Sequence, residues 1–238
     1  MEQDLEKYAK EYDNLLNYKP SYKEVLNVAL DSLKNRLPPG DGRYRIGELG
    51  AGTGNFTKKL ASAYPDSEIY ALDYCKGFVN QLKKNRSGNV SIIRGDAEKN
   101  NFKEGSLDAI VMIHVLRLTQ NADKGYAIQA ASEQLKEGGY FITADIGRKL
   151  DMKNHGKEIL STAYNELGLL GTFKLYYNSR DAIKFNKKCE EMEDKWPKHM
   201  LHTLDEFKNK IEKFNFEILE ARDDLYLGDD DFVVAKKV

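Results

Sequence analysis

The sequence predicts an α/β fold: a Rossmann-like parallel sheet of about seven strands, with an antiparallel last hairpin and helices on both faces. Short apolar runs alternate with helical patterns over residues 41–147, as expected for parallel strands buried on both faces. A glycine-rich turn follows the first of these runs. The chain has 238 residues, enough for one domain with a substantial core.

Composition limits the classes of partner. Charged residues make up 32% and hydrophobic residues 41%, and the net charge is -1, so we expect neither nucleic acid nor a membrane as partner. The N-terminus is charged and no apolar run reaches membrane-spanning length, so we expect no signal peptide or anchor. Cys75 and Cys189 are isolated, which favours free thiols in the cytoplasm and predicts no metal site. We expect a cytoplasmic monomer or homodimer.

Residues 1–40 are expected to form a helical lid of two helices, joined near Lys19 and ended by the prolines of residues 38–40. Ser21 and Glu24 have the spacing of a capping box for the second helix. Four tyrosines are concentrated in this segment: Tyr8, Tyr12, Tyr18 and Tyr22. Either they pack the lid onto the domain, or one or two of them, with Tyr18 as the candidate, line a ligand pocket.

The core, residues 41–147, alternates strands and helices, which implies right-handed crossovers. The expected strands are 44–49, 68–72, 90–93, 108–113 and 140–144, and the expected helices lie near 56–63, 78–82 and 122–135.

Residues 148–202 break this rhythm and are expected to form a helical insertion over the carboxyl edge of the sheet. They carry many aromatic residues, including Tyr164, Phe173, Tyr176, Tyr177, Phe185 and Trp196. These aromatic residues either pack in the core or line a pocket for the substrate. Residues 203–238 are expected to form a helix, capped by Thr203 and Glu206, and a closing pair of strands at 216–221 and 232–237.

The turn after the first strand has glycine at every second position: Gly50, Gly52 and Gly54. Such spacing lets the backbone approach a ligand closely, and the N-terminus of the next helix points at the loop. A dinucleotide fingerprint requires glycine at the sixth position, where Asn55 stands, and no Gly-Lys-Ser/Thr of a phosphate loop follows. Glu48, two residues before the first glycine, would repel a pyrophosphate but suits a cationic ligand.

The run E-L-G-A-G-T-G resembles the first motif of class I S-adenosylmethionine-dependent methyltransferases, whose ligand carries an ammonium and a sulfonium group. Asp73 at the end of the second strand, the run G-D-A-E and the turn L-K-E-G-G extend the resemblance over residues 43–145. It is strongest to small-molecule methyltransferases with an N-terminal helical lid. S-Adenosylmethionine is therefore the expected cofactor.

A carboxylate at Asp73 can accept both ribose hydroxyls, although it could instead be an ordinary aspartate that begins a helix. The resemblance implies that Asp96 accepts from the adenine amine, and the alternative is a helix cap. The expected cofactor-binding residues are Tyr18, Glu48, Gly50, Ala51, Gly52, Gly54, Asp73, Tyr74, Asp96, Ala97, Ile113 and His114.

The resemblance implies methyl transfer to an O or N atom of a small-molecule acceptor, with alignment and water exclusion as the main contributions of the protein. A general base is needed only for an acceptor that is protonated at working pH. Candidates at strand ends and in the insertion are His114, Asp145 and His155, although His114 could equally be a structural histidine. His199 and His202 are expected to be solvated.

Other classes stay open. The chain could be a non-catalytic subunit that binds S-adenosylmethionine. An aminopropyltransferase shares the fold but usually has a triple-glycine turn and an aspartate pair, which are not found here. The Asn-Pro-Pro-Tyr run of enzymes that methylate base amines and glutamine amides is missing, as is a basic stripe, which disfavours nucleic-acid and protein methyltransferases.

Overall fold

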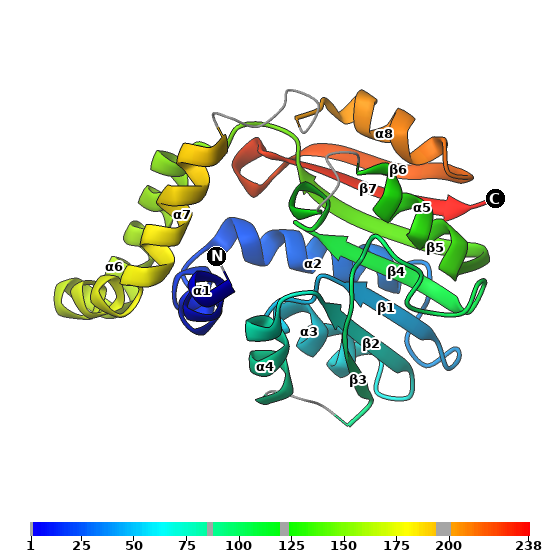
Figure 1. Cartoon of the computed structure of the whole chain (residues 1–238), viewed down its shortest axis with the longest axis horizontal. Coiled ribbons are helices and arrows are strands. Elements are labelled where there is room, and N and C mark those ends of the chain that lie inside the picture. The colour runs from blue at the N-terminus through cyan, green and yellow to red at the C-terminus, as the bar shows by residue number, and fades with distance from the viewer. Residues whose placement is uncertain (1, 85–87, 120–123, 194–200) are drawn as a thin grey trace.

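The computed structural model describes residues 2–84, 88–119, 124–193 and 201–238. Its centre is a seven-stranded sheet in the order β3-β2-β1-β4-β5-β7-β6 (Figure 1). The strands are β1 Arg45–Leu49, β2 Glu68–Asp73, β3 Val90–Arg94, β4 Leu107–Ile113, β5 Leu135–Ile146, β6 Phe216–Leu225 and β7 Asp230–Lys237. Strands β1 to β5 pair in parallel, whereas β7 runs antiparallel to both β5 and β6. The predicted fold class, with its antiparallel final hairpin, is confirmed.

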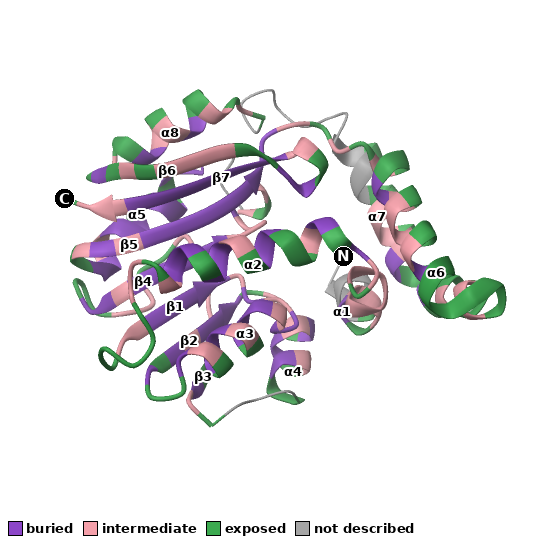
Figure 2. Cartoon of the chain, turned by 180° about the vertical axis from the view of Figure 1, so that it is seen from behind, coloured by how far each residue is buried: buried purple, intermediate pink, exposed green. Residues whose placement is uncertain are grey.

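Helices cover both faces of the sheet (Figure 2). They are α1 Glu2–Leu16, α2 Pro20–Lys34, α3 Asn55–Ala63, α4 Lys76–Lys84, α5 Gly125–Gln134, α6 Met152–Asn178, α7 Arg180–Glu193 and α8 Leu204–Glu212, with short 3-10 turns η1 Leu116–Leu118 and η3 Tyr226–Gly228. On one face, Leu33 of α2 and Leu60 of α3 are fully buried; on the other, Ile128 of α5 and Phe207 of α8 are buried. Each such side chain contributes about 1.5–3 kcal/mol of transfer free energy.

The strand order reverses between β1 and β4, because β2 and β3 lie on one side of β1 and β5 lies beyond β4. At such a switch point the loops after neighbouring strands diverge and leave a crevice at the carboxyl edge of the sheet. The glycine loop follows β1 and His114 follows β4, so both lie at this crevice.

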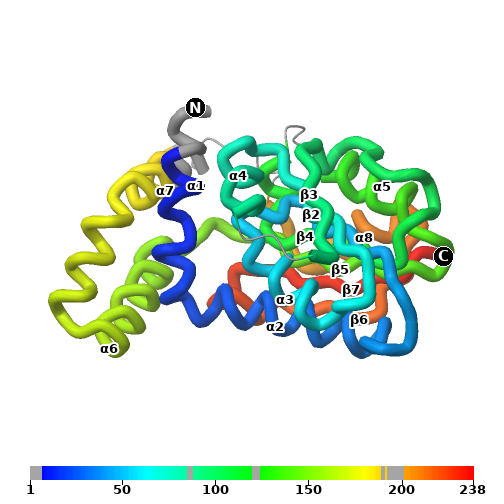
Figure 3. The backbone as a smooth tube through the Cα atoms, turned by 90° about the horizontal axis from the view of Figure 1, so that it is seen from below, coloured from blue at the N-terminus to red at the C-terminus, as the bar shows by residue number. Residues whose placement is uncertain are grey.

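Helix α1 lies apart from the sheet, beside α6 and α7 (Figure 3). Its aromatic side chains bridge two elements: Tyr8 stacks on Phe185 of α7 at 4.4 Å between ring centroids, and Tyr12 packs edge-on against Phe78 of α4 at 5.4 Å. Glu11 extends the bridge, because its carboxylate accepts hydrogen bonds from two backbone N–H groups at the start of α7. A carboxylate at this position satisfies free donors of the helix and complements its dipole.

Three sequence predictions about element ends can be compared with the structure. The capping box of Ser21 and Glu24 is wrong: Pro20 opens α2, and the N–H and hydroxyl of Ser21 both donate to the Glu158 carboxylate, each at 2.7 Å. The capping box at Thr203 is confirmed. Strand β5 begins at Leu135, earlier than predicted, because the chain pairs with β4 through a register shift before the glycine turn.

Cys75 is a free thiol, whereas the Cys189 side chain, Trp196 and His199 lie outside the described residues. Among the helices of the described segments, none is long and apolar enough to cross a membrane.

Candidate active site

The glycines of the loop after β1 have two different roles. Gly50 and Gly54 have φ values of 81° and 92°, and a Cβ would lie 2.2 Å from Val115 at the first and 2.4 Å from Leu82 at the second. Packing therefore requires glycine at both. Gly52 has a φ of 58°, but a Cβ there would meet nothing within 4 Å. The loop is thus closed on the sides of Gly50 and Gly54 and open at Gly52, where a ligand can approach the backbone.

Two buried carboxyl groups lie beneath this loop. Asp73, at the end of β2, accepts hydrogen bonds from the N–H groups of Gly52 and Cys75, each at 2.8 Å. Glu48, in β1, accepts from the Thr57 hydroxyl at 2.5 Å. The side chains hold the loop and the start of α3 against the strand ends, and each carboxylate keeps lone pairs for further donors.

Both carboxyl groups have raised pKa values. Burial raises the pKa of Glu48 to about 8; the Thr57 hydroxyl opposes this shift and the nearby charge of Asp73 adds to it. Burial also raises the pKa of Asp73, against the two backbone donors that lower it. At neutral pH Glu48 is mostly protonated, and a cation placed beside it would favour its ionised form.

The lid contacts the glycine loop directly. Asp13 of α1 accepts hydrogen bonds from Thr53 Oγ1 and Asn55 Nδ2, both at 2.7 Å. The Tyr12 side chain is half-buried beside it, and burial, followed by the charges of Asp13 and Asp73, raises the pKa of its phenol. Sequence analysis did not find Asp13, because nothing local marks an aspartate whose partners lie 40 and 42 positions away.

Asp96 and Ala97, expected near the adenine, lie in the turn after β3. Asp96 accepts from the N–H of Glu98 at 3.0 Å, and no helix follows within 95–106, so the helix-cap alternative is wrong. Ala97 is buried next to it, and Tyr74 is exposed.

Ile113 is half-buried at the end of β4, and Tyr18 is half-buried in the turn between α1 and α2. Ala51 is buried in the glycine loop.

His114 directly follows β4 with a φ of 57°, a left-handed conformation that is uncommon for a residue other than glycine. Its Nε2 lies 2.6 Å from Oδ2 of Asp230. The imidazole lies near two tyrosines, with ring centroids 6.1 Å from Tyr22 and 4.5 Å from Tyr226. Strain of this kind concentrates at functional sites, where the surrounding structure holds it in place.

Lys19 and Tyr226 form a buried pair beside His114. Lys19 Nζ donates to the Tyr226 hydroxyl at 2.6 Å, and both residues are at most 7% exposed. Burial lowers the pKa of Lys19 to about 7, although the carboxylates of Glu158, Asp230 and Asp229 oppose this shift. Burial raises the pKa of Tyr226 well above its usual value, so the phenol keeps its proton. Neither residue belongs to a motif, and sequence analysis missed both.

Three consecutive aspartates at the start of β7 each pair with a different histidine. The pairs are Asp229 with His155 at 2.8 Å, Asp230 with His114 at 2.6 Å and Asp231 with His202 at 2.9 Å. The sequence showed this run only as a turn between strands. The partner histidines come from the end of β4, from α6 and from the segment before α8, so only the folded chain brings the pairs together.

Asp145 and His202 belong to a buried network next to these three aspartate–histidine pairs. Asp145 pairs with Lys124, accepts from Arg117 N at 3.1 Å and lies 3.3 Å from His202 Nε2. Burial raises its pKa, but Lys124 and His202 outweigh burial, so the pKa is lowered and Asp145 stays ionised. His202 was expected to be solvated, and this is wrong: its side chain is 9% exposed, because Asp145 and Asp231 enclose it. Those two carboxylates outweigh burial and raise its pKa.

His155 is also buried, with its ring 4.7 Å from that of Tyr226. Burial, then Lys19, lowers its pKa against the opposing effect of Asp229. Among the described residues, Nδ1 of His155 and Oδ1 of Asp230 are buried without a hydrogen-bond partner. Such atoms are rare in folded proteins and suit a polar group supplied by a ligand.

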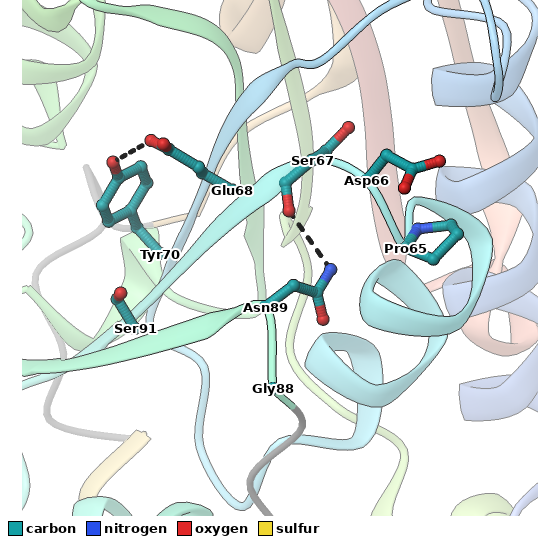
Figure 4. A pocket seen from close by; sticks show the side chains of 8 residues that line it. All are labelled: Pro65, Asp66, Ser67, Glu68, Tyr70, Gly88, Asn89 and Ser91. Atoms are coloured by element: carbon teal, nitrogen blue, oxygen red, sulfur yellow. Dashed lines mark hydrogen bonds between the residues drawn. The ribbon is translucent and has the colours of Figure 1, made fainter.

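An open hollow of about 350 Å³ lies at the opposite edge of the sheet, before β2 and β3 (Figure 4). Its polar side chains already bind within the fold: the Tyr70 hydroxyl donates to Glu68 at 2.6 Å, and Asn89 Nδ2 donates to Ser67 O at 3.2 Å. The buried carboxyl groups and histidines lie at the other edge, so this hollow is not the candidate site. In the described segments, no group of three or more His, Cys, Asp or Glu side chains is placed to hold a metal ion.

Comparison with known proteins identifies the domain. Residues 46–139 match a family described as a methyltransferase domain. This segment of the chain is thus similar to methyltransferase domains. The match spans β1, the glycine loop and β4, and it agrees with the predicted family, whose expected cofactor is S-adenosylmethionine. Gly52 and the paired carboxyl groups fit that cofactor, because an open backbone and buried acids suit a ligand with an ammonium and a sulfonium group.

Individual relatives of the methyltransferase domain differ in what they methylate. A malonyl-[acyl-carrier protein] O-methyltransferase from Methylococcus capsulatus is 30% identical over 52% of this chain and 44% of its own length. A ubiquinone/menaquinone biosynthesis C-methyltransferase from Pseudomonas paraeruginosa is 27% identical over 59% of this chain and 56% of its own length. The chain thus spans about half the length of these curated relatives.

A solved structure of an S-adenosylmethionine-dependent methyltransferase from Aquifex aeolicus aligns with 96% of this chain and 98% of its own. The TM-score is 0.61 and the sequence identity is 15%, so the similarity concerns the fold.

Proposed function

We propose that this chain transfers a methyl group from S-adenosylmethionine to an O or N atom of a small-molecule acceptor, in the crevice between the ends of β1 and β4. The observation that carries the proposal is the pair of buried carboxyl groups, Glu48 and Asp73, under a glycine loop that is open at Gly52. When bound, the cofactor supplies an electrophilic methyl carbon on a positively charged sulfur.

In this proposal the residues of the crevice bind and orient the cofactor. Gly52 presents open backbone, Glu48 faces the ammonium group, and Asp73 offers its remaining lone pairs to the ribose hydroxyls. Asp96 and Ala97 hold the adenine end. The lid, residues 1–40, and the insertion, residues 148–202, exclude water from the reacting groups.

Lys19, His114 and Tyr226 face the acceptor in this proposal. Lys19 has a pKa of about 7, so near neutral pH a large fraction of the amine is unprotonated and can take a proton at Nζ. Tyr226 holds that nitrogen by a hydrogen bond. Asp230 fixes the His114 ring through Nε2, which leaves Nδ1 free to face the acceptor.

Asp145 is left out of the proposed catalytic set, because its lowered pKa and its pairing with Lys124 make it a poor proton acceptor. His155 is kept for its unpartnered Nδ1, as a group that positions the acceptor.

The test is release of S-adenosylhomocysteine by the purified chain with acceptors of three kinds: carboxylic acids and phenols, amines, and activated ring carbons. The proposal expects turnover with an oxygen or nitrogen acceptor. Turnover confined to ring carbons would move the function toward the carbon-methylating relative. Tight binding of S-adenosylmethionine without turnover of any acceptor would support a non-catalytic binding subunit.

A further inference from the structure

The α6–α7 hairpin carries an exposed apolar face on a short helical segment. Gly168, with a φ of 67° and a ψ of −176°, divides α6, and the segment follows it over residues 169–178. Figures 1 and 2 show the hairpin projecting away from the sheet, with α6 largely exposed. Five large side chains of the segment form the apolar face and are between 54% and 85% exposed: Leu169, Leu170, Phe173, Tyr176 and Tyr177.

The apolar face inverts the usual pattern of a surface helix. In a helix with about 3.6 residues per turn, its five positions fall within roughly 120° of arc. The opposite side of the segment is half-buried and consists of Gly171, Thr172 and Leu175. An ordinary surface helix turns its apolar stripe toward the core and its polar side toward water. Here the largest apolar side chains point toward water, which indicates a surface that binds a partner.

The area of the apolar face supports the same conclusion. With about 200 Å² for each fully exposed large apolar side chain, the five exposed fractions correspond to roughly 700 Å². Monomeric proteins rarely expose a contiguous apolar patch larger than a few hundred Å². The apolar face is therefore larger than the scattered apolar residues of an ordinary surface.

A basic stripe on α7 adjoins the apolar face. It consists of Arg180, Lys184 and Lys187, which are exposed and lie three or four positions apart, so they share one side of α7. The stripe begins at the apolar face, because the Arg180 guanidinium lies over the Tyr177 ring, 3.9 Å from its centroid. Residues 164–188 include five basic and two acidic residues, whereas the whole chain has a net charge of -1. The composition of the whole chain predicted no membrane partner because it hides this local excess of positive charge.

The exposed side chains become more polar in order along the chain. Leucine and phenylalanine come first, at positions 169, 170 and 173, tyrosines follow at 176 and 177, and the basic stripe comes last. The same order crosses a membrane interface: aliphatic side chains lie deepest, tyrosines lie at the boundary, and lysine and arginine reach the anionic headgroups. Spanning a bilayer takes about 20 apolar residues, so a segment of this length lies in the interface.

We propose that the apolar face and the basic stripe bind this chain to the surface of an anionic lipid bilayer. The apolar face enters the boundary between headgroups and acyl chains, and the basic stripe pairs with lipid phosphates. The proposal does not depend on the methyl acceptor, because the contact uses no residue of the crevice between β1 and β4.

The first test is co-sedimentation of the full chain with vesicles of phosphatidylcholine and phosphatidylglycerol in equal parts. The expected result is binding that weakens at least about tenfold in Leu170→Glu, because this variant removes apolar area and is repelled by the anionic surface. Tyr126→Glu is the matched control, because Tyr126 lies on α5 and is 55% exposed, and this variant should bind as the wild-type chain does. No binding by the wild-type chain, or equal binding by Leu170→Glu, would overturn the proposal.

The second test separates the basic stripe from the apolar face. Lys184→Glu should weaken binding to the mixed vesicles several-fold, and added salt should also weaken binding of the wild-type chain, because it screens the attraction. Lys103→Glu is the charge-matched control, since Lys103 is exposed in the loop between β3 and β4, and it should bind normally. Equally tight binding of the wild-type chain to vesicles of phosphatidylcholine alone would contradict an anionic lipid surface as the partner.

Insertion of the apolar face has an independent readout. In a chain with Cys75→Ser and Cys189→Ser, an environment-sensitive fluorophore attached at Leu170→Cys should emit at shorter wavelength when the mixed vesicles are added. The same fluorophore at Tyr126→Cys should not respond. An unchanged spectrum at Leu170→Cys would show that the apolar face stays in water, against the proposal.

A protein partner is the competing occupant, and a second copy of this chain is its simplest form. If the wild-type chain does not bind vesicles and sediments alone as a dimer that Leu170→Glu dissociates, the apolar face joins two copies and the membrane proposal is overturned.

Discussion

Glu48 should couple cofactor binding to proton release. Its pKa of about 8 means that the free protein holds it mainly protonated at pH 7, whereas a bound ammonium group favours the carboxylate. Ionising a group one unit below its pKa costs about 1.4 kcal/mol, a factor of about ten in affinity, and at pH 6 the factor is about one hundred. Affinity should therefore rise between pH 6 and pH 8 and then fall, because an α-amino group loses its own proton, and with it the charge that faces Glu48, near pH 8.

The measurement is calorimetric titration with S-adenosylhomocysteine in two buffers of different ionisation enthalpy. The wild-type chain should release close to one proton per ligand at pH 7. Glu48→Gln keeps the shape and the hydrogen bond to Thr57 but cannot ionise, so it should release almost none, and its affinity should not rise from pH 6 to pH 8. Equal proton release by both proteins would refute the assignment of Glu48.

The raised pKa of Glu48 also predicts that the stability of the ligand-free protein depends on pH. The pKa of Glu48 in the folded state lies above the usual value of 4.5. Its contribution to folding stability is therefore fully present below pH 4.5 and is lost as pH rises through about 8. The free energy of unfolding should fall over that range in the wild-type chain by a few kcal/mol more than in Glu48→Gln. Denaturant titrations at pH 6 and pH 8.5 compare the two slopes.

Further substitutions test the loop, the lid and the acceptor side. Asp13→Ala removes two hydrogen bonds of about 1 kcal/mol each, so S-adenosylhomocysteine should bind at least several-fold more weakly and hydrogen exchange in α1 should accelerate. Gly50→Ala should lower the free energy of unfolding by about 3 kcal/mol or more. Gly40→Ala should lower it by about 1 kcal/mol, because φ is also positive there but no atom lies near. Equal melting temperatures of the two variants would contradict this prediction. Lys19→Met should abolish the increase of the turnover rate as pH rises through 7, whereas Tyr226→Phe should shift the midpoint of that increase.

The sequence was sufficient for the features whose signals are local. The glycine loop was predicted because three glycines and one acid stand within seven residues, and the strands were predicted because burial on both faces requires continuous apolar runs. The same holds for the capping box at Thr203. Ser21 was misread because its partner, Glu158, lies 137 positions away and offers a stronger acceptor than a local cap.

The acceptor side could not be predicted for the same physical reason. Lys19 and Tyr226 are separated by 207 positions, and His114 and Asp230 by 116. A lysine before a proline and a tyrosine in a turn look like surface residues until the fold buries them. His202 was misjudged in the same way, because the two carboxylates that enclose it come from β5 and β7.

Helix α1 connects the parts of the molecule that the reaction must coordinate. Its Asp13 binds the glycine loop, while Glu11, two residues earlier, binds the start of α7. A rotation of α1 that releases one contact therefore strains the other, since both side chains leave the same helical turn. The lid and the α6–α7 hairpin should then open together when the cofactor leaves.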